Sequence, residues 1–423
     1  MSDKNLSLRA RMHRVGPTGL IAAFTQIAVA LAVSVHAAPA FAHGDEVLTD
    51  ANAWSTWDLT PDIVLPTLFV AGIYIRGMIR RRDASASTPW WRHVLFFGGL
   101  GSVFLALESP IDPIAEHLFL VHQVQHFLLR MMGPMLLALS WPAGLLTAGL
   151  PAVLRRWVLA PVVGNGFVRV VFGILVQPVV VTVLFIAALY VWEYPPLHDY
   201  ALLNDPVHYL MHVTMLLAGL LFWWRVFDRR PPRTEAELDD APLRGFKALD
   251  VLAAGGLRYG IRLMMLWVVI LSGILIGAYT TVKTTILYPA YDANGRLFGI
   301  APLNDEAVGG VILWIPSSMM CLAAVLIIIH LLGLHEAVLY RRYRARPASN
   351  SAVLLFPTTG AELIARARPK NRYMAFGFMV FVAAVFSSTF LIGRYHDISA
   401  HIAAAPIAHV QHAGDIAPDT TLR

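Results

Sequence analysis

The chain is poor in cysteine and in charged residues. Cys321 is the single cysteine among 423 residues, so the chain cannot close a disulfide on itself or build a metal site from paired thiols. Asp, Glu, Lys and Arg make up only 14% of the residues, well below the usual share in soluble proteins. The sequence has no glycine-rich phosphate loop and no serine or cysteine nucleophile beside a base. Nothing therefore indicates an ATPase, a hydrolase or a transferase.

Hydrophobic residues, in contrast, make up 57% of the chain. Several apolar runs reach the roughly 20 residues that a helix needs to cross a bilayer. The sequence therefore predicts an all-α, polytopic transmembrane helical bundle with about eight spans after an N-terminal signal. The predicted spans lie near residues 62–79, 91–108, 116–140, 168–192, 206–227, 259–282, 307–332 and 373–393.

The N-terminus has the three parts of a secretory signal peptide. Basic residues from Lys4 to Arg14 precede an apolar stretch near 20–35, and Ala40-Phe41-Ala42 forms an A-x-A cleavage site. We expect cleavage after Ala42, which leaves His43 as the first residue, where its amine and imidazole together could chelate Cu(II). Two alternatives stay open: an uncleaved first anchor helix, and a polar N-terminus that binds no metal.

Lys and Arg residues gather in alternate loops. They follow the first span, lie between the third and fourth and between the fifth and sixth, and recur over 341–372. The opposite loops hold little beyond Lys283 and Arg296. Because positive loops stay on the cytoplasmic side, we expect both termini of the mature chain on the outer side. The formal charge of +6 then reflects topology, and no nucleic-acid partner is expected.

Two pairs of histidines occupy apolar segments. His122 and His126 are four residues apart in the third predicted span, and His208 and His212 are four apart in the fifth. Residues at this spacing share one face of a helix, and the topology puts both pairs at similar depth in the outer half of the bundle. Ionisable groups inside membrane spans are costly and mark function, and imidazoles suit copper, zinc or iron. The four histidines therefore predict a metal site. Alternatively, each ring only hydrogen-bonds a neighbouring helix or water.

Further side chains could complete or orient such a site. Thioether and thiol groups would favour Cu(I), although methionine also fills gaps between helices. The candidate accessory ligands are His43, His117, Met211, Met215, Met319, Met320 and Cys321. The carboxylates that could orient imidazoles are Glu108, Asp305 and Glu306, each of which could equally be a solvated residue. Pro134, Pro178 and Pro316 should kink their helices, and the charge of Arg130 lies deep in the third span.

Several segments resemble one protein family. The run from His122 to Leu129 (HQVQHFLL), followed by Gly133-Pro134-Met135-Leu136, resembles the signature of the CtaG family of multi-span assembly factors for caa-type cytochrome c oxidase. Other segments agree with it: Trp57-Asp58 with Pro61, the run HYLMH at 208–212, and the run from Asp305 to Pro316. The sequence departs from the pattern at Glu306 and Leu313, where Gln and Met are expected, and in a span and tail beyond the seven-span family core.

The resemblance implies a role in maturing a copper–haem oxidase, with cytochrome c oxidase subunits and membrane lipid as partners. We expect copper, as Cu(I), at the histidines, delivery to the nascent oxidase, no enzymatic activity, and a location in the bacterial inner membrane. A copper transporter, a b-type haem protein with histidine axial ligands and a scaffold whose histidines only pack are the alternatives.

The sequence also predicts a division of the chain into five parts. These are a signal peptide (1–42), a periplasmic segment (43–60), a CtaG-like transmembrane bundle (61–343), a cytoplasmic loop with the last span (344–393), and a periplasmic tail (394–423) with His396, His401, His409 and His412.

Overall fold

The computed structural model describes residues 48–81, 88–230 and 256–344, together with isolated residues between 372 and 387. The chain divides into two units, Met1–Ala352 and Val353–Arg423, and nearly all described residues belong to the first. Within the described residues the structure is helical and contains no β-strand. The predicted all-α helical bundle is confirmed. The signal peptide, His43, the span near 373–393 and the histidine-containing tail lie outside the described residues or largely so.

The helices follow one another with short connections. Before the bundle stands the short 3-10 helix η1 (Ala53–Ser55), and two π-helical segments, η2 and η3, interrupt the α-helices. The elements are α3 (Pro61–Arg80), α4 (Trp90–Glu108), α5 (Ile111–Ala115), α6 (Phe119–His126), η2 (Phe127–Met132), α7 (Gly133–Ser140), α8 (Ala143–Gly149), α9 (Ala152–Leu154), η3 (Arg155–Leu159), α10 (Ala160–Gly164), α11 (Gly166–Leu175), α12 (Pro178–Trp192), α13 (Pro195–Leu202), α14 (Asp205–Val226), α17 (Tyr259–Val282), α18 (Ala290–Asn294) and α19 (Pro302–Arg344).

Five described helices are long and apolar enough to cross a membrane, namely α3, α4, α14, α17 and the first 36 residues of α19. Three further helix pairs qualify if each pair, bent by 69° to 74°, is one span, which gives up to eight. The span predicted near 168–192, with a kink at Pro178, is divided into two helices. They are α11 and α12, and Pro178 begins the second because proline lacks the N–H that would continue the first.

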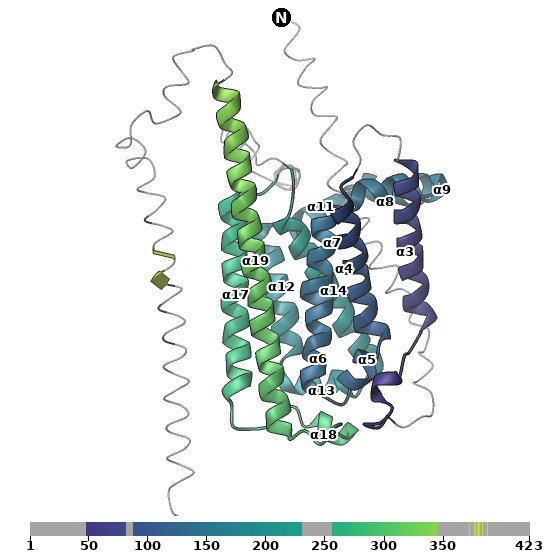
Figure 1. Cartoon of the computed structure of the whole chain (residues 1–423), viewed down its shortest axis with the longest axis vertical. Coiled ribbons are helices and arrows are strands. Elements are labelled where there is room, and N and C mark those ends of the chain that lie inside the picture. Colours follow the sequence, from purple (N-terminus) through teal and green to yellow (C-terminus); the bar gives the residue numbers. More distant parts are fainter. Residues whose placement is uncertain are drawn as a thin grey trace, which may run out of the picture. The chain divides into compact units, whose positions relative to one another are not determined.

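Two groups of connections mark the two ends of the bundle (Figure 1). At one end the guanidinium of Arg92 donates to the carbonyls of Ser140 and Trp141, and the indole of Trp141 donates to the carbonyl of Phe227. At the other end lie α5, α13 and α18, at the starts of α6 and α14. Below, this second end is called the α18 end.

Two glycines let helices come close to α6 and η2. A Cβ on Gly219 of α14 would lie 2.5 Å from the carbonyl oxygen of Arg130 in η2, and one on Gly309 of α19 would lie 2.3 Å from the Phe119 ring of α6. Small residues at such contacts allow close backbone approach in membrane bundles. Helices α14 and α19 therefore pack directly against the segment that carries His122 and His126.

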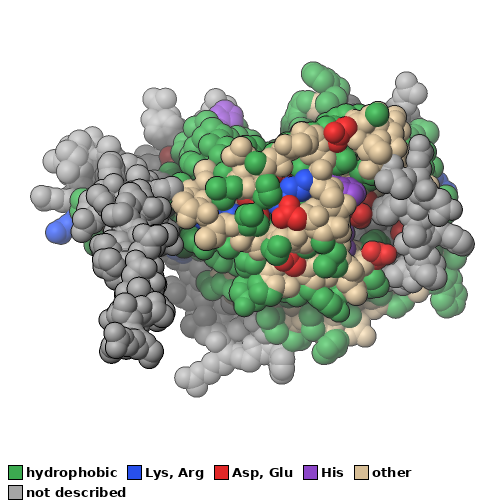
Figure 2. Space-filling view, turned by 90° about the horizontal axis from the view of Figure 1, so that it is seen from below, with side chains coloured by type: hydrophobic (Ala, Val, Ile, Leu, Met, Phe, Trp, Pro, Cys, Tyr) green, Lys and Arg blue, Asp and Glu red, His purple; other side chains and the backbone are tan. Residues whose placement is uncertain are grey.

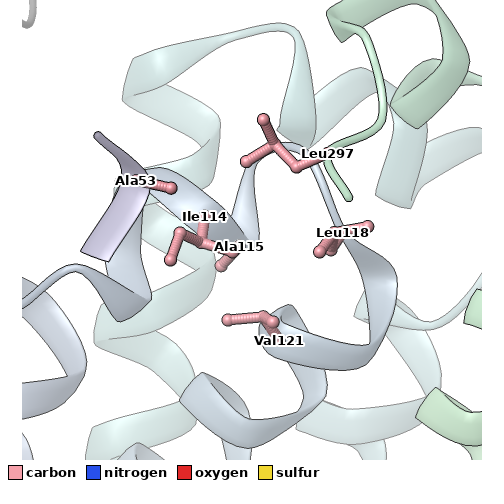
Figure 3. Close-up of a cluster of buried hydrophobic side chains, with 6 residues drawn as sticks. All are labelled: Ala53, Ile114, Ala115, Leu118, Val121 and Leu297. Carbon is pink, nitrogen blue, oxygen red and sulfur yellow. The ribbon is translucent and has the colours of Figure 1, made fainter. Parts of the chain in front are cut away.

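A small hydrophobic cluster closes the α18 end beside α6 (Figure 3). Its buried members are Ala53, Ile114, Ala115, Leu118, Val121 and Leu297. They come from η1, from α5 and the start of α6, and from the loop before α19. Burial of these apolar side chains fixes the chain around the first turn of α6.

Candidate metal centre

Four histidine rings meet in the interior of the bundle. The ring centroids of His122 and His126 on α6 are 4.3 Å apart, and those of His208 and His212 on α14 are 4.5 Å apart. Across the two helices, His122 lies 5.2 Å from His208, and His126 lies 5.8 Å from His212. All four are buried, with His122 completely inaccessible. The structure therefore brings together the four histidines that the sequence selected.

The rings of His122, His126 and His212 are arranged so that together they could bind one metal ion. One nitrogen from each of His122, His126 and His212 lies within 4.8 Å of the other two. The Nε2 atoms of these three rings are buried and form no hydrogen bond with any described residue. Buried polar atoms are almost always satisfied, and an exception calls for a specific explanation such as an ion. Imidazole nitrogen is a good ligand for copper, zinc and iron, so the donor set fits a transition metal.

The start of α6 is held by a carboxylate from another helix. Leu118, the residue before α6, provides no side-chain cap. Asp305 of α19 accepts hydrogen bonds from the backbone N–H groups of Phe119 and Leu120, at 3.0 and 2.9 Å. It satisfies two donors that a helix N-terminus leaves open, and it is itself paired with Arg296. This cap fixes the turn that leads into His122.

The helix changes its winding directly after the second histidine. Residues Phe127–Met132 form a π-helical segment, a rare feature that often occurs at functional sites. On the opposing helix, the side chain of Asn204 accepts from the N–H of Val207 and caps the first turn of α14, one turn before His208. Both histidine pairs thus lie on well-anchored helix starts.

The Nδ1 atoms of three histidines face oxygen atoms. His122 Nδ1 lies 2.6 Å from the hydroxyl of Tyr291. His126 Nδ1 lies 3.7 Å from the carboxylate of Glu193, and His208 Nδ1 lies 4.0 Å from that of Glu116. Metal-binding histidines commonly direct one nitrogen to an oxygen acceptor and the other to the metal. The His122 ring follows that pattern, whereas His126 Nδ1 has no hydrogen-bond partner among the described residues and its contact with Glu193 at 3.7 Å is electrostatic.

Glu193 is a fully buried carboxylate beside the rings. The amide of Gln123 donates to it at 2.8 Å, and the hydroxyl of Tyr288 lies 3.3 Å from its other oxygen. Among the described residues no Lys or Arg forms an ion pair with Glu193; its ion-pair partner is His126. A buried negative charge without a Lys or Arg in contact is costly, and only the charge of Arg130, which lines the same cavity as His126, offsets it in part. The carboxylate therefore favours a positive charge at the histidines.

The loop between α17 and α19 covers the histidines at the α18 end. Burial raises the pKa of Tyr288 and Tyr291 above the ordinary tyrosine value, so both hydroxyls keep their protons. Glu306 holds this loop by accepting from the backbone N–H groups of Leu287 and Tyr288 and by pairing with Lys283. Seen from this end, acidic and basic side chains gather near the middle of the face, with histidine beside them (Figure 2).

Two small cavities that share Arg130 in their linings lie inside the bundle. One is lined by Gln123, His126 and Arg130, and the other by Arg130 and Cys321 among others. The Arg130 guanidinium donates to the carbonyl of Phe185 at 2.9 Å and lies 3.8 Å from the centre of the Phe185 ring. Among the described residues no carboxylate pairs with Arg130, so a positive charge stands between the histidines and the thiol.

The other predicted site residues lie in several places. Met211 and Met215 pack in a hydrophobic cluster with Leu189 and Leu313. Met319 is 57% exposed on α19. His117 contacts the carbonyl of Gly295 at 2.7 Å. Met320 is half-buried on α19, and Cys321 lines the cavity that Arg130 also lines. The three predicted carboxylates have other partners: Glu108 accepts from Thr60, Asp305 caps α6, and Glu306 holds the loop between α17 and α19.

Four residues near the histidines were absent from the predicted site: Gln123, Glu193, Tyr288 and Tyr291. Glu193 and Tyr291 are 67 and 165 residues from His126 and belong to different elements, so no local spacing connects them to the histidines. One sequence feature could have indicated part of this set: Gln123 is a polar residue between the two histidines of an apolar helix.

Comparison with known proteins gives one family. The sequence model of the family described as cytochrome c oxidase caa3 assembly factor (Caa3_CtaG) matches residues 72–238 and 249–332, more than half of the chain. An uncharacterized protein of Mycobacterium leprae is 25% identical over 257 residues, 59% of this chain and 35% of its own length. An uncharacterized protein of Mycobacterium bovis is 24% identical over 274 residues, 63% of this chain and 38% of its own length. The chain thus spans little more than a third of these relatives. No solved structure matches the chain.

Proposed function

The chain belongs to the cytochrome c oxidase caa3 assembly factor family, and from this premise we propose that it is a copper carrier of the bacterial inner membrane. It would hold Cu(I) at His122, His126 and His212, with His208 beside them, and deliver the ion to nascent cytochrome c oxidase. The role is that of a carrier and not of an enzyme.

One observation carries the proposal. The Nε2 atoms of His122, His126 and His212 are buried and without hydrogen-bond partners among the described residues, and one nitrogen of each ring lies within 4.8 Å of the other two. If these histidines only packed the helices, each Nε2 would be expected to find a donor or acceptor. A bound transition metal satisfies all three at once. Because the ligands are imidazoles and no closed thiolate cage surrounds them, the ion can be released as well as held.

Charge favours the monovalent ion. The imidazoles are neutral ligands, and Glu193 adds one buried negative charge next to His126. The Arg130 guanidinium, which lines the same cavity, already acts on this carboxylate, so a monovalent ion adds less uncompensated charge to the bundle than a divalent ion does. Cu(I) is the monovalent transition metal ion that His and Met ligands accept.

The position of the rings suits delivery on the outer side of the membrane. The histidines lie on α6 and α14 toward the α18 end. At the opposite end of the bundle, which we place in the cytoplasm, the helices begin or end near five described arginines: Arg80, Arg92, Arg225, Arg230 and Arg262. Copper held here would pass to an oxidase subunit in the membrane without crossing the bilayer.

Transport across the membrane is the competing function, and Arg130 argues against it. Arg130 lines both the cavity beside His126 and the cavity that reaches Cys321, so an ion moving from the histidines to the thiol would meet its guanidinium. A fixed positive charge in a narrow path repels cations. Vesicles that contain the purified protein should therefore take up no more Cu(I) than vesicles that contain the His122→Ala/His126→Ala variant. Uptake that depends on the histidines would favour the transporter.

Oxidase maturation in cells tests the proposed function. In a strain without the native gene, the wild-type gene should restore copper-loaded cytochrome c oxidase and the His122→Ala/His126→Ala gene should not. His93→Ala is the matched control, because His93 is a histidine of α4 that contacts Tyr74 at 3.0 Å and does not join the cluster. Normal oxidase activity with the double variant, present at wild-type level in the membrane, would overturn the proposal.

A further inference from the structure

Two residues outside the ligand set form a chain of hydrogen bonds that ends on His122. His198 Nδ1 lies 2.9 Å from the backbone carbonyl oxygen of Trp192. His198 Nε2 lies 2.8 Å from the hydroxyl oxygen of Tyr291, and the same hydroxyl lies 2.6 Å from His122 Nδ1. Each of these three side chains is buried, so water does not compete for the hydrogen bonds.

The direction of all three hydrogen bonds follows from the first one, between His198 and the Trp192 carbonyl. A backbone carbonyl only accepts, so His198 carries a proton on Nδ1. Among the described residues no carboxylate pairs with the buried His198 ring, and an unpaired imidazole in such surroundings is neutral. Its Nε2 therefore has a lone pair and accepts the Tyr291 O–H. The tyrosine has only one proton, so its oxygen must accept from His122 Nδ1–H.

The hydrogen bond from His122 Nδ1–H to the Tyr291 oxygen decides which nitrogen of His122 can bind a metal. A neutral imidazole with its proton on Nδ1 has its lone pair on Nε2. Nε2 is the buried atom of His122 that has no hydrogen-bond partner. We infer that His198 and Tyr291 are positioning residues that set the tautomer of His122, so that its Nε2 is ready to bind Cu(I). The inference rests on the proposed function for the identity of the ion.

These hydrogen bonds also explain why His198 need not be a ligand although it is close to the site. Its ring centroid lies 5.0 Å from that of His122, yet both its nitrogens are engaged. Removal of its acceptor nitrogen should have a specific consequence. The Tyr291 proton would turn to His122 Nδ1, and the His122 proton would move to Nε2, where it blocks the metal.

Copper affinity, measured with Tyr291 present and in a Tyr291→Phe background, tests this step. Cu(I) is titrated anaerobically against a chromogenic chelator with the full chain in detergent. His198→Leu should weaken Cu(I) binding 10- to 100-fold, the usual effect of losing a partner that orients a metal ligand. In the Tyr291→Phe background the same change should have little further effect, because His198 acts only through the tyrosine hydroxyl. His198→Gln, whose amide oxygen can still accept the Tyr291 proton, should recover part of the affinity.

Two controls separate orientation from general damage. Tyr74→Phe also removes a buried tyrosine hydroxyl that contacts a histidine, but at His93, and should leave copper affinity unchanged. Nitrogen-15 NMR of the metal-free protein with labelled histidine reads the tautomer directly. The His122 signals, assigned by their loss in His122→Ala, should show the proton on Nδ1 in the wild type and on Nε2 in His198→Leu.

The outcomes distinguish the inference from the function on which it rests. An equal loss of affinity from His198→Leu in both the Tyr291 and the Tyr291→Phe backgrounds would overturn the inference and leave the copper site in place. A proton on His122 Nε2 in the wild type would also overturn it. A wild-type protein that shows the expected tautomer but binds no copper would support the hydrogen-bond chain and contradict the proposed function.

Discussion

Replacement of Glu193 by glutamine should weaken Cu(I) binding by about thirtyfold. The Glu193 carboxylate lies 3.7 Å from His126 Nδ1, so a cation bound on the far side of that ring lies roughly 8 Å from the carboxylate oxygen. At an effective dielectric constant of about 20, a unit charge at that distance contributes about 2 kcal/mol. Glutamine keeps the shape of the side chain and removes only this charge.

The assay is a competition titration of Cu(I) at fixed ionic strength. Glu108→Gln is the matched control, because Glu108 is another buried carboxylate of the bundle but accepts from the backbone N–H and hydroxyl of Thr60. It should change the affinity less than threefold, because a charge farther from the site acts more weakly. Unchanged affinity in Glu193→Gln, or equal losses in both variants, would refute the assignment of Glu193 as the counter-charge.

Two further predictions concern the scaffold. Gly219→Ala should lower the unfolding free energy in detergent by about 1–3 kcal/mol, because its Cβ would meet the Arg130 carbonyl oxygen at 2.5 Å. The control Gly72→Ala has open space around it and should leave the unfolding free energy unchanged. Equal effects of the two variants would contradict the close α14–η2 contact. Asp305→Asn should cost about 3–5 kcal/mol, the usual result of breaking a buried ion pair. Asp292→Asn, which removes the 45% exposed partner of the same arginine Arg296, should cost less than about 1 kcal/mol. Thermal unfolding of the purified variants measures both, and a small effect of Asp305→Asn would contradict a stabilising Asp305–Arg296 ion pair.

The histidine cluster could be predicted because its information is local and repeated. The spacing of four puts both members of each pair on one helix face, and the apolar surroundings mark each pair as unusual. Topology from the Lys and Arg pattern then indicated that the two pairs lie at one level. The structure confirms that His122, His126, His208 and His212 meet.

The surroundings of the cluster could not be predicted, because they depend on contacts distant in the sequence. Glu193 follows α12, and Tyr291 lies in α18; only the packed bundle places them beside His122 and His126. Asp305 was expected to orient an imidazole, but it caps α6 instead. The break before Pro178 was expected as a kink, yet the chain ends one helix there and begins another.

Elemental analysis of the detergent-purified protein after anaerobic Cu(I) loading shows whether the four histidines hold copper. We expect about one copper ion per chain in the wild type and in His93→Ala, and none in the His122→Ala/His126→Ala variant. Iron in place of copper would indicate a haem protein. A wild-type protein that retains no metal after loading would contradict the copper site and leave the four histidines with a purely structural role.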